Sequence, residues 1–150
     1  MDEERMKRLQ DHLALIRACA GWSSTDLGNR LGVTRQMISN LETSKTYTMT
    51  KMQYLAIRKV LDDEIRSSPE EETQMLRDIL EILVDHPENY SEEVRGKILE
   101  NAKLLAPAAA AKDSDRRNIS LAWGAVAGIA AAAIGIGIEI LTSTDNKNEN

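Results

Sequence analysis

Several polar side chains recur at short intervals in the stretch VTRQMISNLET. Their ends are short, amide-bearing or cationic: Arg35, Gln36, Ser39, Asn40 and Thr43. An amide can pair bidentately with adenine and a guanidinium with guanine, each with about 1–3 kcal/mol of discrimination. On a helix these residues would share one side, where a solvated face would more often carry Glu and Lys. The spacing therefore predicts a helix face that touches the base edges of DNA.

Start and stop signals define the helix that carries this face. Gly32 ends the preceding helix, Thr34 is the expected N-cap, and Val33 with Ile38 fits the two positions of a hydrophobic staple. Ile38 and Leu41 point away from the polar side and must be buried. The polar face should therefore point outward, near the N-terminus of a helix whose dipole favours anions.

The short helix before it carries equally clear signals in WSSTDL. Ser23 is the expected N-cap, Asp26 follows three residues later as in a capping box, and Trp22 with Leu27 repeats the staple. Two short helices joined by a tight turn containing Gly32 predict a helix-turn-helix.

Two longer helices complete a predicted domain over residues 1–66. The first has one apolar stripe, formed by Met6, Leu9, Leu13, Ile16 and Ala20. The second, from about Thr48 to Ile65, has two stripes, which are Met52/Ala56/Val60 and Tyr54/Ile57/Leu61/Ile65. So small a domain can bury only one of them, and the other is expected to meet a second copy of the chain. A homodimer would set two recognition helices about 34 Å apart on a near-palindromic operator in double-stranded DNA.

The segment LGNRLGVTRQMISNLETSK resembles the helix-turn-helix of the XRE family, of the lambdoid phage repressor and Cro type. The similarity covers roughly residues 9–62. It implies that four residues contact DNA bases, namely Arg35, Gln36, Ser39 and Asn40. It implies phosphate contacts by Ser24, Thr43 and Lys45. It also implies a structural ion pair between Arg17 and Glu42.

Three positions depart from the family pattern. Ser24 replaces the usual Gln at the start of the first short helix, Gly28 replaces the usual Ala in its middle, and Ser44 replaces the usual Gly after the recognition helix. The first departure affects one phosphate contact. The third implies a less regular exit from the recognition helix.

The remaining composition favours binding over catalysis. Cys19, His12 and His86 are too far apart in sequence for a metal site, and no catalytic or nucleotide-binding motif is present. We therefore expect no enzymatic activity, no metal and no cofactor. Residues 1–66 carry 11 basic and 9 acidic residues, whereas residues 67–118 carry 7 and 12. Only the first segment has a charge balance that favours a polyanion.

Residues 67–106 predict an amphipathic helical hairpin. Ser68 is the expected N-cap of its first helix, with Pro69 at the first position, and Ser91 opens the second. A unit of about forty residues is too small to build a generous core alone. We expect the hairpin to pack on a second copy of itself, with packing on the first domain, or a mere spacer role, as the alternatives.

A linker over 107–118 precedes a weakly hydrophobic run of 23 residues, 119–141, in which Glu139 is the only charged residue. Such a length is enough to cross a bilayer, and basic residues on its N-terminal side favour a cytoplasmic first domain. The alternative is a buried helix in an oligomer core. A small-residue stripe suits close helix packing in the membrane: Gly124, Gly128, Ala131 and Gly135. Residues 142–150 form a polar tail.

The sequence as a whole predicts an all-α protein with a repressor-like helix-turn-helix domain, a helical hairpin and one C-terminal transmembrane helix. The expected function is that of a dimeric, sequence-specific transcriptional regulator of prokaryotic or phage type, such as a repressor, attached to the cytoplasmic membrane by a single span. The alternative is a membrane-anchored cytoskeletal adaptor of the RodZ type, in which the helix-turn-helix binds protein instead of DNA. An antitoxin-like protein partner is a third possibility.

Overall fold

Helices form all the regular structure in the part of the chain that the computed structural model describes, which is residues 3–43, 45–111 and 115–125. The labelled elements are α1 (Glu3–Asp11), α2 (Leu13–Cys19), α3 (Ser24–Leu31), α4 (Arg35–Thr43), α5 (Lys51–Ser67), η1 (Glu70–Thr73), α6 (Gln74–Ile79), the π-helical turn η2 (Leu80–Asp85), η3 (Pro87–Asn89) and α7 (Glu92–Ala110). A further helix covers 116–125.

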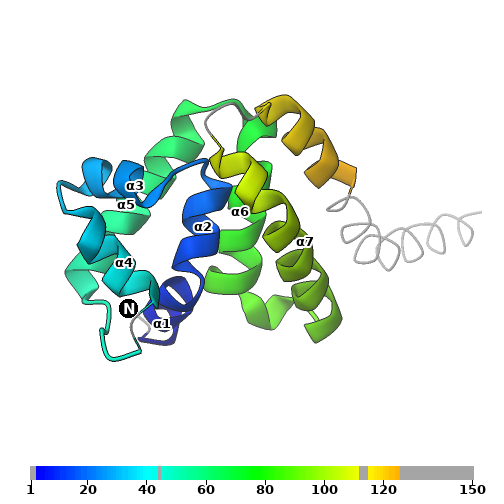
Figure 1. The fold of residues 1–150 in the computed structure, drawn as a ribbon. Coiled ribbons are helices and arrows are strands. Elements are labelled where there is room, and N and C mark those ends of the chain that lie inside the picture. Colours follow the sequence, from blue (N-terminus) through cyan, green and yellow to red (C-terminus); the bar gives the residue numbers. More distant parts are fainter. Residues whose placement is uncertain (1–2, 44, 112–114, 126–150) are drawn as a thin grey trace, which may run out of the picture.

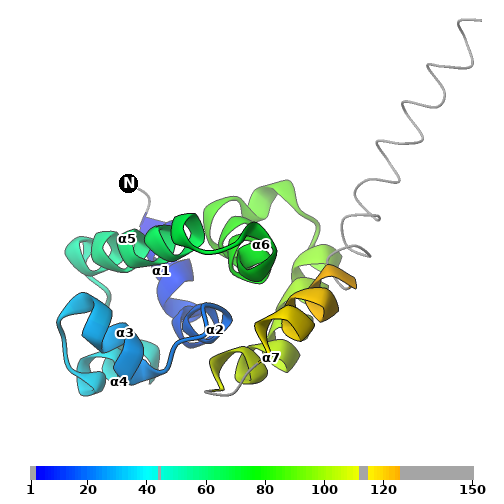
Figure 2. The same cartoon turned by 90° about the horizontal axis from the view of Figure 1, so that it is seen from above.

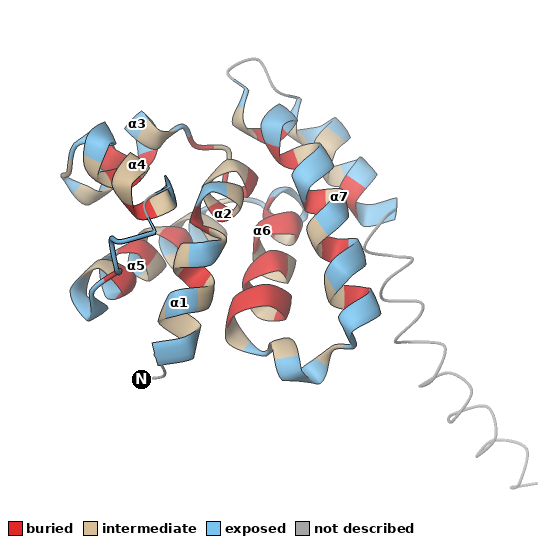
Figure 3. Ribbon diagram, turned by 60° about the horizontal axis from the view of Figure 1, so that its bottom comes forward, coloured by how far each residue is buried: buried red, intermediate tan, exposed pale blue. Residues whose placement is uncertain are grey.

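The helices are arranged around α2. Helices α3, α4 and α5 lie at one end of the molecule and α7 at the other, with α2 and α6 between them (Figures 1 and 2). Buried residues are most concentrated on α6 and η2 (Figure 3), and one apolar cluster runs from Leu9 of α1 to Trp123 of the 116–125 helix. The helix-turn-helix therefore shares its core with the C-terminal half of the chain.

The first predicted helix is divided in two. Its apolar stripe is buried except for Met6, which is half-buried, but His12 interrupts the helix with φ −112° and ψ 13°. Backbone hydrogen bonds continue across the break, from the N–H of His12 to the carbonyl of Arg8 and from the N–H of Ile16 to the carbonyl of His12. The interruption is therefore a local bend between α1 and α2.

Helix α5 buries one of its two predicted apolar stripes and leaves much of the other exposed. Tyr54, Ile57 and Leu61 are buried, whereas Met52 is 81% exposed and Ala56 is also exposed. The helix begins at Lys51 and not near Thr48, because Thr50 caps it. The side chain of Thr50 accepts from the N–H of Gln53, whose side chain accepts from the N–H of Thr50. This capping box fixes the start of the helix.

The hairpin packs on the first domain of its own chain, which is the alternative that the sequence left open. Helix α7 lies against α2, and η2 lies against α1. The guanidinium of Arg58 makes two hydrogen bonds to the Asp85 carboxylate, at 3.0 and 3.1 Å. Arg8 donates to the carbonyl of Val84 at 2.8 Å. These cations satisfy carbonyl and carboxylate groups at the C-terminal end of η2, where the helix dipole favours positive charge.

The ends of the hairpin also differ from the prediction. Ser68 is the C-cap of α5 and not an N-cap, and its hydroxyl lies 3.3 Å from the Glu64 carboxylate. Ser91 does cap α7. Helix α7 continues through Pro107 to Ala110, so the predicted linker over 107–118 is shorter than expected. Alanine is the best helix former, and Ala109 in this stretch is buried, which keeps the helix intact past the proline.

The helix over 116–125 packs against the protein. Trp123 is fully buried, and its indole N–H donates to the Asp78 carboxylate on α6 at 2.9 Å. On α5, Glu64 accepts from Arg116 at 3.4 Å, and Arg116 also donates to the carbonyl of Ala20 at 3.2 Å. The first residues of the predicted membrane span therefore have protein partners.

Among the residues that the structure describes, no helix combines the length and the apolarity needed to cross a bilayer. This finding overturns the predicted C-terminal transmembrane helix and, with it, the single-pass membrane localisation. Of the predicted membrane-packing residues, Gly124 is exposed on the 116–125 helix, while Gly128, Ala131 and Gly135 lie outside the described residues, as does 126–141 as a whole.

Candidate nucleic-acid interface

Helix α4 presents its polar side outward because its apolar side is held in the core. Ile38 is fully buried and Leu41 is 3% exposed. On the other side Arg35 and Gln36 are exposed, and Asn40 is half-buried. The residues predicted to contact bases are therefore brought together on one helix, and the two in its first turn are open to solvent.

The turn between α3 and α4 is fixed by local hydrogen bonds. At the start of α3, the Ser23 hydroxyl accepts from the N–H of Asp26 at 3.0 Å, and the Asp26 carboxylate accepts from the N–H of Ser23 at 2.8 Å. Gly32 ends α3 in the left-handed region, with φ +70°. The Thr34 hydroxyl then accepts from the N–H of Met37 at 3.2 Å, which satisfies one free donor at the start of α4.

The structure gives a physical reason for glycine at position 28. A Cβ at this position would lie 2.8 Å from the carbonyl oxygen of Val33, closer than two such atoms can approach. The N–H of Val33 also donates to the carbonyl of Gly28 at 2.9 Å. The absence of a side chain therefore allows the turn to close tightly on α3.

Two of the predicted base-reading side chains are joined to each other. The Gln36 amide donates to the Asn40 carbonyl oxygen at 3.0 Å, one helical turn apart. This bond orders both amides while leaving the Gln36 oxygen as an acceptor and the Asn40 nitrogen as a donor. A donor beside an acceptor matches the N7 and N6 groups of adenine in the major groove.

The predicted phosphate contacts are placed differently from one another. Lys45 is exposed just after α4, and Ser24 is half-buried at the start of α3. The Thr43 hydroxyl donates to the carbonyl of Ser39 at 2.7 Å, so its proton is already engaged within the helix. Lys45 is therefore the side chain best prepared to meet a phosphate, because an ammonium has three donors.

The expected ion pair between Arg17 and Glu42 is present and shielded from water. The Arg17 Nε atom lies 2.5 Å from Oε1 of Glu42, and its Nη2 atom lies 3.2 Å from Oε2. The side chains are 16% and 7% exposed. Arg17 also donates to the carbonyl of Trp22 at 2.8 Å. One guanidinium thus joins α2, the entry to α3 and the last turn of α4.

Two supporting groups were missed by the sequence reasoning. The Arg30 guanidinium lies 4.1 Å from the centre of the Trp22 ring, and one of its nitrogens lies 3.8 Å from the Glu64 carboxylate. Gln10 of α1 bonds the backbone at the end of α4 and beyond it. The contacts of Arg30 with Glu64 and of Gln10 with the backbone join residues more than 30 positions apart, so neither capping nor periodicity indicates them.

The outer side of α4 carries guanidinium, amide and hydroxyl groups. Within the described residues, no group of three or more His, Cys, Asp and Glu side chains could hold a metal ion. Comparison of the chain with protein-family models, with curated proteins and with solved structures gave no match. The interpretation of this face therefore depends on its own geometry.

Proposed function

We propose that the chain is a sequence-specific transcriptional regulator that binds double-stranded DNA through α4. The observation that carries the proposal is the hydrogen-bonded pair of Gln36 and Asn40 on the outer side of a capped helix anchored by Ile38. The major groove, about 12 Å wide, admits one α-helix and offers a distinct donor and acceptor pattern at each base pair. Arg35 in the first turn adds a guanidinium suited to guanine.

A second copy of the chain would complete the regulator. Met52, Leu55 and Tyr47 are 81%, 47% and 40% exposed, so large apolar side chains are left open to solvent on and just before α5. A homodimer formed there would present two α4 helices to successive turns of one DNA face. Its operator would be nearly palindromic. Replacing Met52 with Glu should then shift the protein to monomer in analytical ultracentrifugation.

Selection from a random duplex library tests the DNA-binding proposal. The purified chain is expected to enrich one near-palindromic sequence. Gln36→Ala and Asn40→Ala should each weaken binding to that sequence by about 1–3 kcal/mol, while affinity for unrelated duplexes stays nearly unchanged. Asn101→Ala, which removes an exposed amide from α7, is the matched control and should change neither affinity.

The alternative is that α4 binds a protein. Failure of the chain to enrich any duplex, together with no measurable binding to arbitrary DNA at 50 mM salt, would contradict the DNA-binding proposal. Equal loss of specific and non-specific affinity in the two amide variants would show instead that α4 does not read bases.

A further inference from the structure

The segment between α4 and α5 has little packing of its own. Of residues 45–49, only Met49 is buried, and the others are exposed. Lys45, the best-placed phosphate contact, belongs to this segment. Some other interaction must therefore hold the backbone that carries Lys45.

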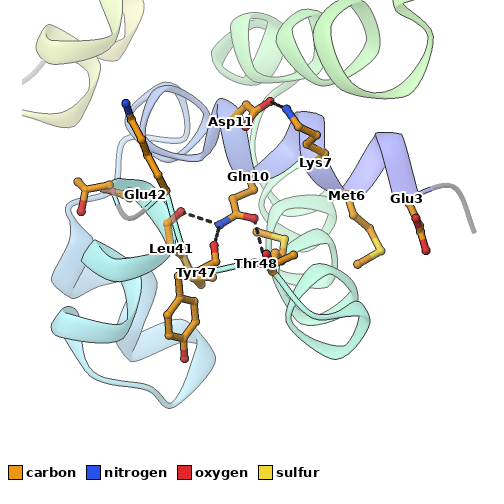
Figure 4. Close-up of a pocket in the computed structure, with 12 residues that line it drawn as sticks. Glu3, Met6, Lys7, Gln10, Asp11, Leu41, Glu42, Tyr47 and Thr48 are labelled. Carbon is orange, nitrogen blue, oxygen red and sulfur yellow. Dashed lines mark hydrogen bonds and ion pairs between the residues drawn. The ribbon is translucent and has the colours of Figure 1, made fainter.

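Gln10 of α1 supplies such an interaction (Figure 4). Its amide nitrogen donates to the carbonyl of Leu41 at 3.2 Å and also to the carbonyl of Tyr47. Its amide oxygen accepts from the N–H of Met49 at 2.9 Å. Both N–H groups and the oxygen are thus engaged, and the two carbonyls and one N–H fix the orientation of the amide.

A cavity of about 760 Å³ surrounds this amide, between α1, the end of α4 and the segment. Met6 and Lys7 line it from α1, and Tyr47 and Thr48 from the segment (Figure 4). Because open space lies on this side of the segment and only Met49 is packed in the core, the directed hydrogen bonds of Gln10 help to fix where the segment lies. The bond to Leu41 also satisfies one of the carbonyls left free in the last turn of α4.

We propose that Gln10 is a positioning residue for nucleic-acid binding: its amide fixes the end of α4 and residues 45–49, and so places Lys45 against the DNA backbone. The inference rests on the proposed DNA-binding function. Gln10 itself contacts no DNA, because its amide is occupied by the backbone of its own chain. The loss of Gln10 should therefore weaken DNA binding through the phosphate contact of Lys45. The loss should depend on salt and be the same for all DNA sequences.

Salt titration of binding to a 30-base-pair duplex of arbitrary sequence tests the proposal. Gln10→Met keeps the length of the side chain and removes all three hydrogen bonds. We expect its slope of log affinity against log salt to fall by about 1, as for Lys45→Ala, and its affinity at 0.1 M salt to fall roughly fivefold to tenfold. The double variant should match Lys45→Ala alone, because both changes remove one contact. Gln74→Met, the same replacement on α6, should leave slope and affinity unchanged.

Hydrogen exchange supplies a readout that does not involve DNA. The Met49 amide should exchange at least tenfold faster in Gln10→Met than in the wild type or in Gln74→Met, at a temperature where all remain folded. Gln10→Glu serves as the second variant if Gln10→Met does not fold, since its carboxylate keeps the acceptor for Met49 but opposes both carbonyls. It should show the same loss of salt slope.

The outcomes separate this inference from the proposed function. A wild type that binds DNA, with Gln10 variants of unchanged salt slope and unchanged Met49 exchange, overturns the positioning role and leaves the function standing. Additive losses in the double variant also overturn it, because Gln10 then acts apart from Lys45. A wild type that binds no duplex at 50 mM salt overturns the proposed function and the positioning role together.

Discussion

Helix α4 and the 116–125 helix are both short, and the sequence predicts a function for each. It predicts DNA binding for α4 and part of a membrane span for the 116–125 helix. In α4, Gln36 and Asn40 lie on the outer side as predicted, because Ile38 occupies the inner side. In the 116–125 helix, Trp123 is fully buried against α6, while Leu121 is 66% exposed. The spacing of residues in α4 correctly predicted which side of that helix is buried, whereas the average hydropathy of 119–141 did not indicate that Trp123 would pack against α6.

An ion pair between an arginine and a glutamate joins each of the two helices to the rest of the protein. Arg17 joins α4 to α2 through a two-point ion pair with Glu42. Arg116 joins its helix to Glu64, which also lies 3.8 Å from Arg30 of α3. The first pair is more buried, since Arg17 is 16% and Arg116 is 41% exposed. The attachment of α4 should therefore be harder to break without unfolding the protein.

The largest effect is expected at the Arg17–Glu42 pair. Arg17→Met or Glu42→Gln should each lower the free energy of unfolding by about 3–5 kcal/mol, because one charge is left buried without its partner. The double variant should lose less than the sum of the two. Urea unfolding of all four proteins measures this coupling, and small additive losses would show that the pair is not energetically linked.

The next effect is expected at the other helix. Trp123→Ala should cost about 3 kcal/mol, because it removes a fully buried indole and its bond to Asp78. Leu121→Ala, on the exposed side of the same helix, should cost little.

The reactivity of the Cys19 thiol reports whether the 116–125 helix stays packed against the protein. Burial raises the pKa of its thiol to about 12, and Cys19 lines one small cavity together with Arg116 and Ile119 of the 116–125 helix. Alkylation by iodoacetamide should therefore be slow in the wild type and in Leu121→Ala, but fast in Trp123→Ala. Equal rates in all three proteins would show that the helix stays docked without its tryptophan.

Local signals correctly predicted the start and stop residues of the helix-turn-helix and the start of α7. The caps at Ser23, Thr34 and Ser91 and the left-handed Gly32 each depend on residues within four positions, so the sequence contains all the information needed. Ser68 shows the limit of this reasoning, because a residue that suits an N-cap ends α5 instead.

Long-range contacts were not predictable from pattern alone. Gln10 bonds Met49, 39 residues away, and Arg58 bonds Asp85, 27 residues away. Neither residue is distinguished in sequence from an ordinary solvated side chain. The docking of the hairpin on α1 and α2 depends on such contacts, which is why the sequence pattern did not favour packing on the first domain.

A smaller effect on stability is expected at two glycines. Replacement by alanine should have effects of opposite sign at Gly28, in the helix-turn-helix, and at Gly96, in the C-terminal half. Gly28→Ala should destabilise by about 1–3 kcal/mol, because its Cβ would overlap the Val33 carbonyl. Gly96→Ala on α7 meets no atom within 4 Å and should stabilise by about 0.5–1 kcal/mol, since alanine favours the helix. Thermal melts check both. Stabilisation by Gly28→Ala would show that α3 and the turn do not close as tightly as described.

The smallest effect concerns pH, and the two histidines of the chain should act in opposite directions. Burial lowers the pKa of His12 below 6.5, with Lys103 lowering it further and Asp11 opposing. The unfolded chain then binds a proton that the folded chain resists, so His12 should reduce stability as pH falls below about 6.5. At His86, a hydrogen bond to Glu81, together with its charge, raises the pKa. That residue should add stability at low pH and lose it as pH rises through the raised pKa.

Urea unfolding at pH 7.5, 6.5 and 5.5 separates the two histidines. Glutamine carries no charge at any of these values, so each substitution removes one titration and leaves the carboxylates unchanged. His12→Gln should gain stability relative to the wild type as pH falls, because the penalty at the bend between α1 and α2 is gone. His86→Gln should lose stability relative to the wild type over the same range. Parallel pH profiles for all three proteins would mean that neither ring differs in pKa between the folded and unfolded chain.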